Sequence, residues 1–367
     1  MSVVPKVFFY CRPYESPERA GYEHALIILG EGLKELGVPF CSNVPYWRLA
    51  PDREEYLFNP DPGVDPCECD VVVFGSPWFG YGGQIPRELT TARRRGRMVY
   101  VDQADGLVTD SWKPEFRAFD LILKTHFNRK LAYPSNCRPW AFGLPSRIIR
   151  ETASGLMPFE QRRRVVLSNF RHNHQLRRLV NRELIPRLSP ALELDRFTDS
   201  LGEEPSDPWQ KLQWAQTGRR HYASYYRRLC ESVACACFGG CFVTAWPRNP
   251  AAWLAQRLNV LIADKGFRPH AIAQFDSFRL WESLAAGCLT LHADLEKYGI
   301  LLPEMPVNGR HYLGVCLDNT SEAAAAILRD APSWEGIAGA GREWALAHYG
   351  PRATAERFLG LPGLRAG

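Results

Sequence analysis

The chain has 367 residues, of which 46% are hydrophobic and 23% are charged, and its formal net charge is +5 at pH 7. The length predicts two or three domains, and the ordinary composition excludes an intrinsically disordered chain. The small positive charge does not by itself predict nucleic-acid binding, and no apolar run of about 18 residues predicts a membrane span. The opening residues, MSVVPKVFFY, lack the pattern of a secretory signal, so the expected compartment is the cytoplasm.

Strand and helix patterns alternate through the first half of the chain, which is typical of a parallel α/β layer. Apolar runs predict strands at residues 6–10, 38–43, 70–75, 97–102, 119–124 and 140–144. The spacing of apolar residues predicts helices at 23–36 and 85–95. The run DVVVFG at residues 70–75 is of the type that is buried on both faces of a parallel sheet.

A polar, turn-rich stretch at residues 151–164 separates the halves, and the alternating pattern then restarts. Strands are predicted at 165–169, 192–197, 259–263 and 288–292, and helices at 175–188, 221–236, 277–286, 342–348 and 352–359. Residues 203–218 are polar and contain proline, which predicts an irregular insertion. The repeated plan predicts two Rossmann-like, doubly wound domains that face each other across a cleft, with ligands at the carboxyl ends of the strands.

The most informative segment is residues 274–291, QFDSFRLWESLAAGCLTL, where Asp276 or Ser277 is placed to cap a predicted helix. Arg279 and Glu282 are three residues apart and project from one side of this helix, close to the N-terminus that favours an anion. A nucleoside diphosphate suits this arrangement, with its phosphates on Arg279 and the helix N-terminus and its ribose hydroxyls on Glu282. From the spacing alone, a surface salt bridge between Arg279 and Glu282 is slightly favoured, because such pairs are common.

Residues 275–291, FDSFRLWESLAAGCLTL, preceded by VLIADKGF at 260–267, resemble the donor-site region of GT-B glycosyltransferases, especially the CgeB-like and exostosin-like groups. The ending REWALAHYGPRATAERFL, residues 342–359, is similar to the tail helices that close many GT-B chains. The resemblance extends over about residues 165–359. It implies transfer of a sugar from a nucleotide-activated donor to a hydroxyl of a glycan or small-molecule acceptor.

The better-known retaining GT-B pattern has two Glu residues eight positions apart, and Glu282 matches the second, which implies that it binds the ribose. Gln274 stands where the first would fall, so the role of that carboxylate does not carry over. Asp276 lies two residues out of register with it. The resemblance therefore leaves the stereochemical outcome open.

Four further residues are expected near the donor phosphates. Asn169 and Arg171 belong to the polar loop after the predicted strand at 165–169, for which a solvated loop is the alternative interpretation. Lys265 and Arg268 belong to the loop after the predicted strand at 259–263.

An inverting transfer needs one base that takes the proton of the acceptor hydroxyl. Asp102 and Asp105 follow a predicted strand, at the edge where a parallel sheet places its chemistry, and His126 follows the next strand. His24 is a further candidate for this base. An Asp at a strand end is also a common turn or capping residue, which is the alternative for Asp102 and Asp105.

A metal site is not expected. The Cys67–Cys69 and Cys235–Cys237 pairs lack the C-x-x-C spacing of a structural zinc site. Cys235, Cys237 and Cys241 lie in the apolar stretch SVACACFGGCFV and are interpreted as buried small apolar residues, with metal binding as the alternative. The Asp-x-Asp motif of metal-dependent glycosyltransferases does not occur, and no cofactor is expected. A P-loop, a G-x-G-x-x-G turn after the first strand and a G-x-S-x-G elbow are also absent from the sequence.

These observations predict an acceptor-side domain at residues 1–154, a nucleotide-sugar domain at 155–345 and a final helix at 346–367 that packs back on the first domain. The expected partners are a nucleotide-sugar donor and a glycan or small-molecule acceptor, without nucleic acid. A nucleotide-sugar epimerase of the GT-B fold and a non-catalytic nucleotide-sugar-binding protein are the alternative functions.

Overall fold

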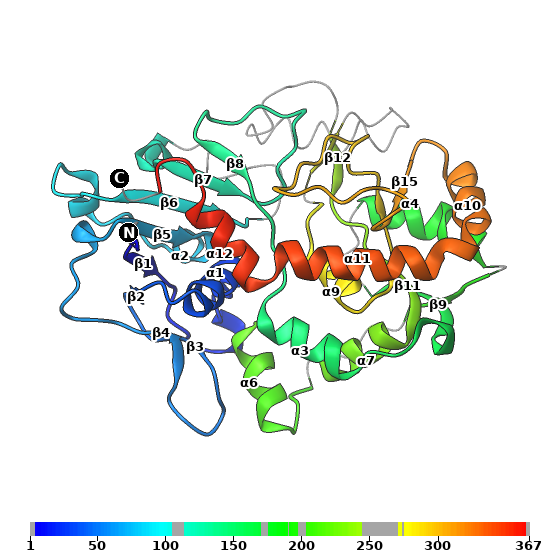
Figure 1. Cartoon of the computed structure of the whole chain (residues 1–367), viewed down its shortest axis with the longest axis horizontal. Helices are drawn as coiled ribbons and strands as arrows, with labels where there is room; N and C mark the ends of the chain where they lie inside the picture. Colours follow the sequence, from blue (N-terminus) through cyan, green and yellow to red (C-terminus); the bar gives the residue numbers. More distant parts are fainter. Residues whose placement is uncertain are drawn as a thin grey trace.

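The computed structural model describes residues 4–104, 114–169, 175–189, 191–196, 203–243, 271–273 and 275–364, and Figure 1 shows their arrangement. The strand predicted at residues 259–263 lies outside the described residues, as do the candidate site residues Asp105, Arg171, Lys265 and Arg268.

The first sheet has six strands in the order β2-β1-β5-β6-β7-β8, and every pairing is parallel. The strands are β1 (Val7–Tyr10), β2 (Phe40–Ser42), β5 (Val71–Gly75), β6 (Arg97–Asp102), β7 (Leu121–Lys124) and β8 (Cys137–Pro139). Alternate residues enter separate cores on the two faces, so that Phe9 packs with helix α1 (His24–Glu35) while Phe8 joins an aromatic core with Tyr100. This burial on both faces explains the continuous apolar runs in the sequence.

The second sheet has five parallel strands in the order β10-β9-β11-β14-β15. They are β9 (Arg163–Leu167), β10 (Glu193–Asp195), β11 (Ser232–Ala236), β14 (Leu289–Ala293) and β15 (Leu313–Val315). In both sheets the strand order reverses next to the first strand, between β1 and β5 and between β9 and β11. Open α/β sheets bind ligands outside the carboxyl ends of the strands at such reversal points.

The remaining elements cover these sheets and connect them. The α-helices are α2 (Ser76–Gly80), α3 (Ser146–Ser154), α4 (Gln175–Glu183), α5 (Ile185–Leu188), α6 (Pro208–Gln216), α7 (Ala223–Glu231), α9 (Phe278–Ala285), α10 (Thr320–Arg329), α11 (Trp334–Tyr349) and α12 (Pro351–Leu359). Short 3-10 helices are η1 (Pro17–Arg19), η2 (Pro66–Glu68), η3 (Arg87–Thr90), η5 (Pro114–Ala118), η6 (Phe159–Gln161) and η7 (Ala331–Ser333). Two antiparallel pairs join β3 (Tyr46–Arg48) to β4 (Tyr56–Phe58) and β12 (Cys241–Val243) to β13 (Ala271–Ala273).

Helix α11 runs along the second domain, and α12 continues to the first domain and packs on α1 (Figure 1). Ala355 and Phe358 of α12 enter the same core as β1. The approach is close, because a Cβ added at Gly32 of α1 would lie 2.0 Å from the carbonyl oxygen of Pro351. The chain therefore ends against the domain in which it began.

The predicted helix at residues 85–95 is wrong. Only the short 3-10 helix η3 forms there, and the hydroxyls of Thr90 and Thr91 donate to the carbonyls of Arg87 and Glu88. Such local bonds from threonine side chains compete with a regular helix.

The predicted helix at residues 221–236 is correct only in its first part, α7, because residues 232–236 form the strand β11. The run SVACA pairs between β9 and β14, and periodicity alone does not separate a short buried strand from a buried helix. The predicted strand at 140–144 is also wrong, since β8 ends at Pro139.

The predicted irregular insertion at residues 203–218 contains helix α6. Asp207 caps α6 by accepting from the backbone N–H of Gln210 at 2.8 Å, and Pro208 stands at the first helical position. These two residues are a helix-start signal, although the polar composition of the segment predicted an irregular structure.

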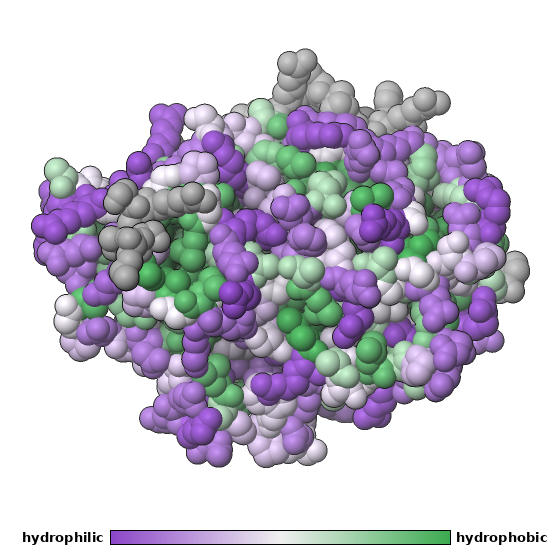
Figure 2. Space-filling view, viewed as in Figure 1, coloured by the Kyte–Doolittle hydropathy of each residue, from purple (hydrophilic) through white to green (hydrophobic). Residues whose placement is uncertain are grey.

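The surface is mostly hydrophilic on the face drawn in Figure 2, with smaller hydrophobic areas between the polar side chains. In the described part of the chain, no helix combines the length and the hydrophobicity that a membrane span requires.

Candidate functional site

Loops that follow strands of the two sheets bond to each other. Asn128, in the loop after β7, donates from its amide to the carbonyl oxygens of Ile272 at 2.8 Å and Tyr298 at 2.9 Å. Tyr298 belongs to the loop after β14, and Leu301 in the same region donates to the carbonyl of Phe127 at 3.0 Å. These loops follow the carboxyl ends of parallel strands, the edge at which α/β proteins bind ligands.

Helix α9 starts at this edge and carries Arg279, one of the predicted donor residues. The Nε of Arg279 donates to the backbone carbonyl of Asn169, which follows β9 at the reversal point of the second sheet. Its guanidinium also lies over the ring of Tyr225, 5.8 Å from the centroid. The structure therefore brings the predicted residues Arg279 and Asn169 together, although they are far apart in the sequence.

Ser277 occupies the N-cap position of α9 with an extended backbone, but its side chain makes no capping bond. Its hydroxyl is buried and has no hydrogen-bond partner among the described residues. A polar hydroxyl therefore stands at the N-terminus of α9.

Glu282 is only 5% exposed, and both of its carboxylate oxygens accept hydrogen bonds from α7. The hydroxyl of Tyr225 donates to Oε2 at 2.9 Å, and the hydroxyl of Tyr226 donates to Oε1 at 3.0 Å. This burial contradicts the exposed surface position that the salt-bridge alternative requires. A tightly held carboxylate lies one helical turn behind Arg279.

Arg147 on α3 continues the network from Glu282, and the sequence analysis missed it. It is 4% exposed and donates to the hydroxyl of Tyr226 at 3.0 Å, to Nδ1 of His221 at 3.1 Å and to the hydroxyl of Tyr22 at 2.8 Å. Burial opposes its charge, but attraction to Tyr22, Tyr226 and Glu282 raises the pKa of Arg147 above its ordinary value. The guanidinium therefore remains charged inside the protein.

His24 is fully buried at the start of α1 and has both ring nitrogens engaged. Nε2 donates to the carbonyl of Gly143 at 3.2 Å, and Nδ1 accepts from the hydroxyl of Tyr22 at 2.7 Å. Burial and the charge of Arg147 lower the pKa of His24 well below its ordinary value. This neutral imidazole, stacked 4.4 Å from Phe278, has a structural environment rather than that of a base open to substrate.

Asp102 ends β6 and is completely buried. Its carboxylate lies 3.2 Å from the ammonium of Lys124, which ends the adjacent strand β7, and it also accepts from the backbone N–H of Ala104 at 3.1 Å. Since removing either charge leaves the other uncompensated in the interior, this pairing opposes a role as the base.

His126 and Asp276 link the two domains at the start of α9. The backbone N–H of Asp276 donates to Nδ1 of His126 at 3.0 Å, and His126 has a left-handed φ of +56°. The carboxylate of Asp276 accepts from the backbone N–H of Phe142 at 2.8 Å and from the indole of Trp281 at 2.7 Å. Burial raises the pKa of Asp276 to about 7. Asp276 therefore connects α9 to the first domain.

Glu23 is a second buried residue that sequence reasoning missed. It precedes α1, and one oxygen accepts from the backbone N–H of Arg12 at 3.4 Å. The other oxygen faces Gly75, where an added Cβ would lie 1.8 Å from it. Burial raises the pKa of the Glu23 carboxyl well above its ordinary value. This carboxyl lies at the reversal point of the first sheet, between β1 and β5.

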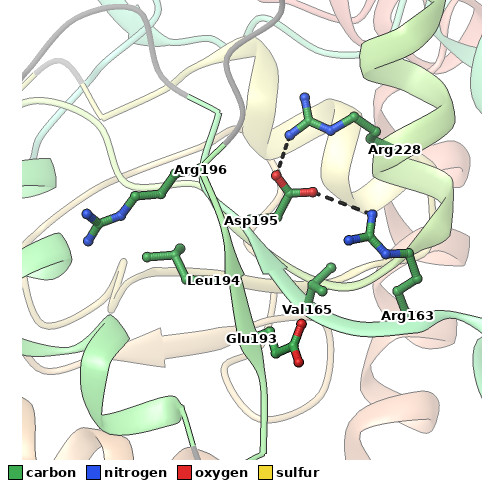
Figure 3. Close-up of a pocket in the computed structure, with 7 residues that line it drawn as sticks. All are labelled: Arg163, Val165, Glu193, Leu194, Asp195, Arg196 and Arg228. Atoms are coloured by element: carbon green, nitrogen blue, oxygen red, sulfur yellow. Dashed lines mark hydrogen bonds and ion pairs between the residues drawn. The ribbon is translucent and has the colours of Figure 1, made fainter.

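A cavity of about 490 Å³ lies at the edge strand β10 of the second domain (Figure 3). The carboxylate of Asp195 pairs there with Arg228 at 2.6 Å and with Arg163 at 3.6 Å. Figure 3 shows both guanidinium groups directed toward Asp195, while Arg196 extends to the other side of the strand. Three of the charged residues that line this cavity, Asp195, Arg163 and Arg228, thus interact with one another.

Among the residues that the structure describes, no group of three or more His, Cys, Asp or Glu is arranged to hold a metal ion. Cys235 and Cys237 are buried as predicted, whereas Cys241 is partly exposed. Cys67 and Cys69 are also buried.

No protein-family model matches the sequence, and no curated protein matches it. The solved structure of AviGT4, a glycosyltransferase involved in avilamycin A biosynthesis, is similar over 97% of this chain and 96% of its own, with 12% identity and a TM-score of 0.50. The chain has the GT-B fold. This agrees with the predicted pair of Rossmann-like domains.

Two further similar structures have lower TM-scores. An alpha-glucosyltransferase in complex with UDP is similar over 96% of this chain and 98% of its own, with 10% identity and a TM-score of 0.48. Anabaena Alr3699/HepE in complex with UDP-glucose has the same coverage of both chains, with 13% identity and a TM-score of 0.44.

Proposed function

We propose that this protein is a glycosyltransferase that moves a sugar from a nucleoside diphosphate donor to an acceptor hydroxyl. The observation that carries the proposal is the pair Arg279 and Glu282 on α9, at the carboxyl edge of the second sheet of a GT-B fold. AviGT4, which shares this fold, is a glycosyltransferase. The closer relationship to the CgeB-like and exostosin-like groups rests on the sequence of residues 275–291 and forms part of this proposal.

In the proposed donor site, the diphosphate binds at the N-terminus of α9. The helix N-terminus, the Ser277 hydroxyl and the Arg279 guanidinium supply donors and positive potential there. Asn169 lies beside this position because its carbonyl holds Arg279. Arg171, Lys265 and Arg268 remain predicted phosphate contacts from the sequence.

Glu282 is proposed to accept hydrogen bonds from the ribose. Each carboxylate oxygen has two acceptor sites, and the two tyrosine hydroxyls use one on each oxygen. The carboxylate therefore retains acceptor capacity on both oxygens.

We propose that the departing diphosphate is stabilised without a metal ion, by Arg279 and the helix N-terminus. Donors that are fixed in place where negative charge develops lower the barrier without needing to reorganise. Replacing Arg279 is therefore expected to slow sugar transfer more than adding a metal chelator does.

Asp105 is the proposed base among the three predicted catalytic residues. Asp102 is held in its ion pair with Lys124. His126 accepts a backbone N–H on Nδ1, so the neutral ring carries its proton on Nε2 and acts there as a hydrogen-bond donor. The acceptor class and the cytoplasmic location remain predictions from the sequence.

A thermal-shift panel of UDP, GDP, TDP, ADP and CMP tests the donor site. A ligand at about 100 times its dissociation constant adds about 2.7 kcal/mol to stability, which corresponds to a shift of several degrees. At least one nucleoside diphosphate is expected to stabilise the protein, whereas the matching free nucleoside serves as the control. If no nucleotide shifts the melting temperature, the proposed function is wrong.

The matching nucleotide-sugar then distinguishes the reaction classes. A transferase consumes it faster when an acceptor hydroxyl is supplied, whereas an epimerase converts the sugar without any acceptor. Binding without any turnover would indicate a non-catalytic protein.

A further inference from the structure

Tyr226 stands between two buried charges of opposite sign. Its hydroxyl accepts from Nη1 of Arg147 at 3.0 Å and donates to Oε1 of Glu282 at 3.0 Å. Arg147 is 4% exposed, Tyr226 1% and Glu282 5%. The direction of both bonds is fixed, because a guanidinium only donates and a carboxylate only accepts. One hydroxyl therefore connects the guanidinium to the carboxylate.

The other contacts of Arg147 do not supply a negative charge directly. Tyr22 and His221 accept hydrogen bonds from Arg147, and Nε2 of His221 donates to the side-chain oxygen of Gln210 at 2.7 Å. Burial lowers the pKa of His221 below its ordinary value, which favours the neutral ring. The nearby carboxylates are Glu282, through Tyr226, Glu151, which lies 3.4 Å from His221, and Glu31 on α1, whose pKa the charge of Arg147 lowers against the larger effect of burial.

Tyr225 provides a natural comparison within the same site. Its hydroxyl donates to the other oxygen of Glu282 at 2.9 Å, and its ring lies beneath Arg279 rather than against Arg147. Tyr225 and Tyr226 thus make equivalent hydrogen bonds to one carboxylate, but Tyr226 also links it to Arg147.

We propose that Arg147, acting through Tyr226, is a positioning residue that holds the Glu282 carboxylate in its orientation toward the ribose of the donor. This inference rests on the proposed function. The guanidinium of Arg147 fixes the hydroxyl of Tyr226, and that hydroxyl fixes Oε1 of Glu282. Without this link the carboxylate is free to turn, and its hold on the ribose hydroxyls would weaken.

The ionisable groups around Glu282 come from several elements. They are Arg279 on its own helix, Tyr225 and Tyr226 on α7, Arg147 on α3, His221 before α7 and Tyr22 before α1. Burial raises the pKa of both α7 tyrosines well above the ordinary value, and the charge of Glu282 raises it further. These hydroxyls therefore stay neutral and act as hydrogen-bond donors to Glu282.

The test uses calorimetric titration of the full chain with UDP and 2′-deoxy-UDP, or with the corresponding pair of whichever nucleotide stabilises the protein most. We expect the wild type to prefer the ribonucleotide about tenfold, the usual contribution of a hydrogen bond to a charged acceptor. Tyr226→Phe and Arg147→Met are expected to lose most of this preference. Tyr225→Phe, which removes a hydroxyl that bonds to the same carboxylate but not to Arg147, is expected to retain it.

Arg147→Met removes more contacts than Tyr226→Phe, so the tyrosine variant decides the result if the arginine variant fails to fold. The positioning role would be overturned if Tyr226→Phe kept the wild-type preference for the ribonucleotide. It would also be overturned if Tyr225→Phe lost as much of this preference as Tyr226→Phe. A wild type that binds no nucleotide would instead overturn the proposed function. The two failures are therefore distinguishable.

Discussion

Replacing Glu282 with Gln tests the proposed ribose contact with little change in side-chain size. A hydrogen bond to a charged acceptor contributes about 1.5–3 kcal/mol, so losing the carboxylate is expected to weaken nucleoside diphosphate binding about 10- to 150-fold. Within the protein, the amide keeps one acceptor oxygen and loses the other, which faces a tyrosine hydroxyl at 2.9 or 3.0 Å. We expect this loss to cost about 1–2 kcal/mol of stability, which leaves the protein folded.

Calorimetric titration with the nucleotide, together with a melting curve, separates the two effects. Asp120→Asn is the matched control, because Asp120 is a half-buried carboxylate that accepts from the backbone N–H of Met98 at 2.7 Å, near the start of β6 and away from the donor site. We expect Asp120→Asn to change the melting temperature without changing affinity. Unaltered affinity in a folded Glu282→Gln protein would refute the ribose contact and leave Glu282 with only the structural role that its tyrosine bonds indicate.

Three further results are expected. Asp105→Ala should abolish transfer, measured as release of the nucleotide, and spare nucleotide binding; a fully active variant would remove Asp105 from the base role. Lys124→Met should lower the unfolding free energy by about 3–5 kcal/mol in urea, because it strands the buried charge of Asp102, and adding Asp102→Asn should restore much of the loss. Burial raises the pKa of Asp276 to about 7, so the native state binds more protons than the unfolded state between about pH 4 and 7. Stability should therefore fall as the pH rises through this window, and Asp276→Asn should flatten that slope in urea titrations.

The fold was predictable because its signals are local. The inner strands β5 and β14 are short runs of mainly apolar residues that are buried along their whole length, and α9 follows from the helical spacing of Phe278, Trp281 and Leu284. Errors arose where local signals were ambiguous, as at β11, whose five buried residues continue the helical pattern of α7.

The candidate site was predictable only in part, because its network joins distant segments. The spacing of Arg279 and Glu282 predicts that they lie on one side of their helix. It does not predict the contact with α7, whose two tyrosines bond to the Glu282 carboxylate. Arg147 has no motif around it, and its place depends on the packing of α3 against α7 and α9.

The pairing of Asp102 with Lys124 was predictable from the sequence. The two residues end neighbouring predicted strands, and in the sheet they are direct partners in the parallel register. Residues in register on adjacent strands point to the same face, so opposite charges there are expected to pair.

Helix α9 is linked to the first domain at two points. Asp276 at its start bonds to Phe142 and His126, and Glu282 in its body is linked through Tyr226 and Arg147 to Tyr22. The position of Arg279, which lies between these points, is therefore fixed by contacts from both domains before any nucleotide binds. Groups that are already ordered lose little conformational freedom on binding, so more of their interaction energy is available to the ligand and to the developing charge.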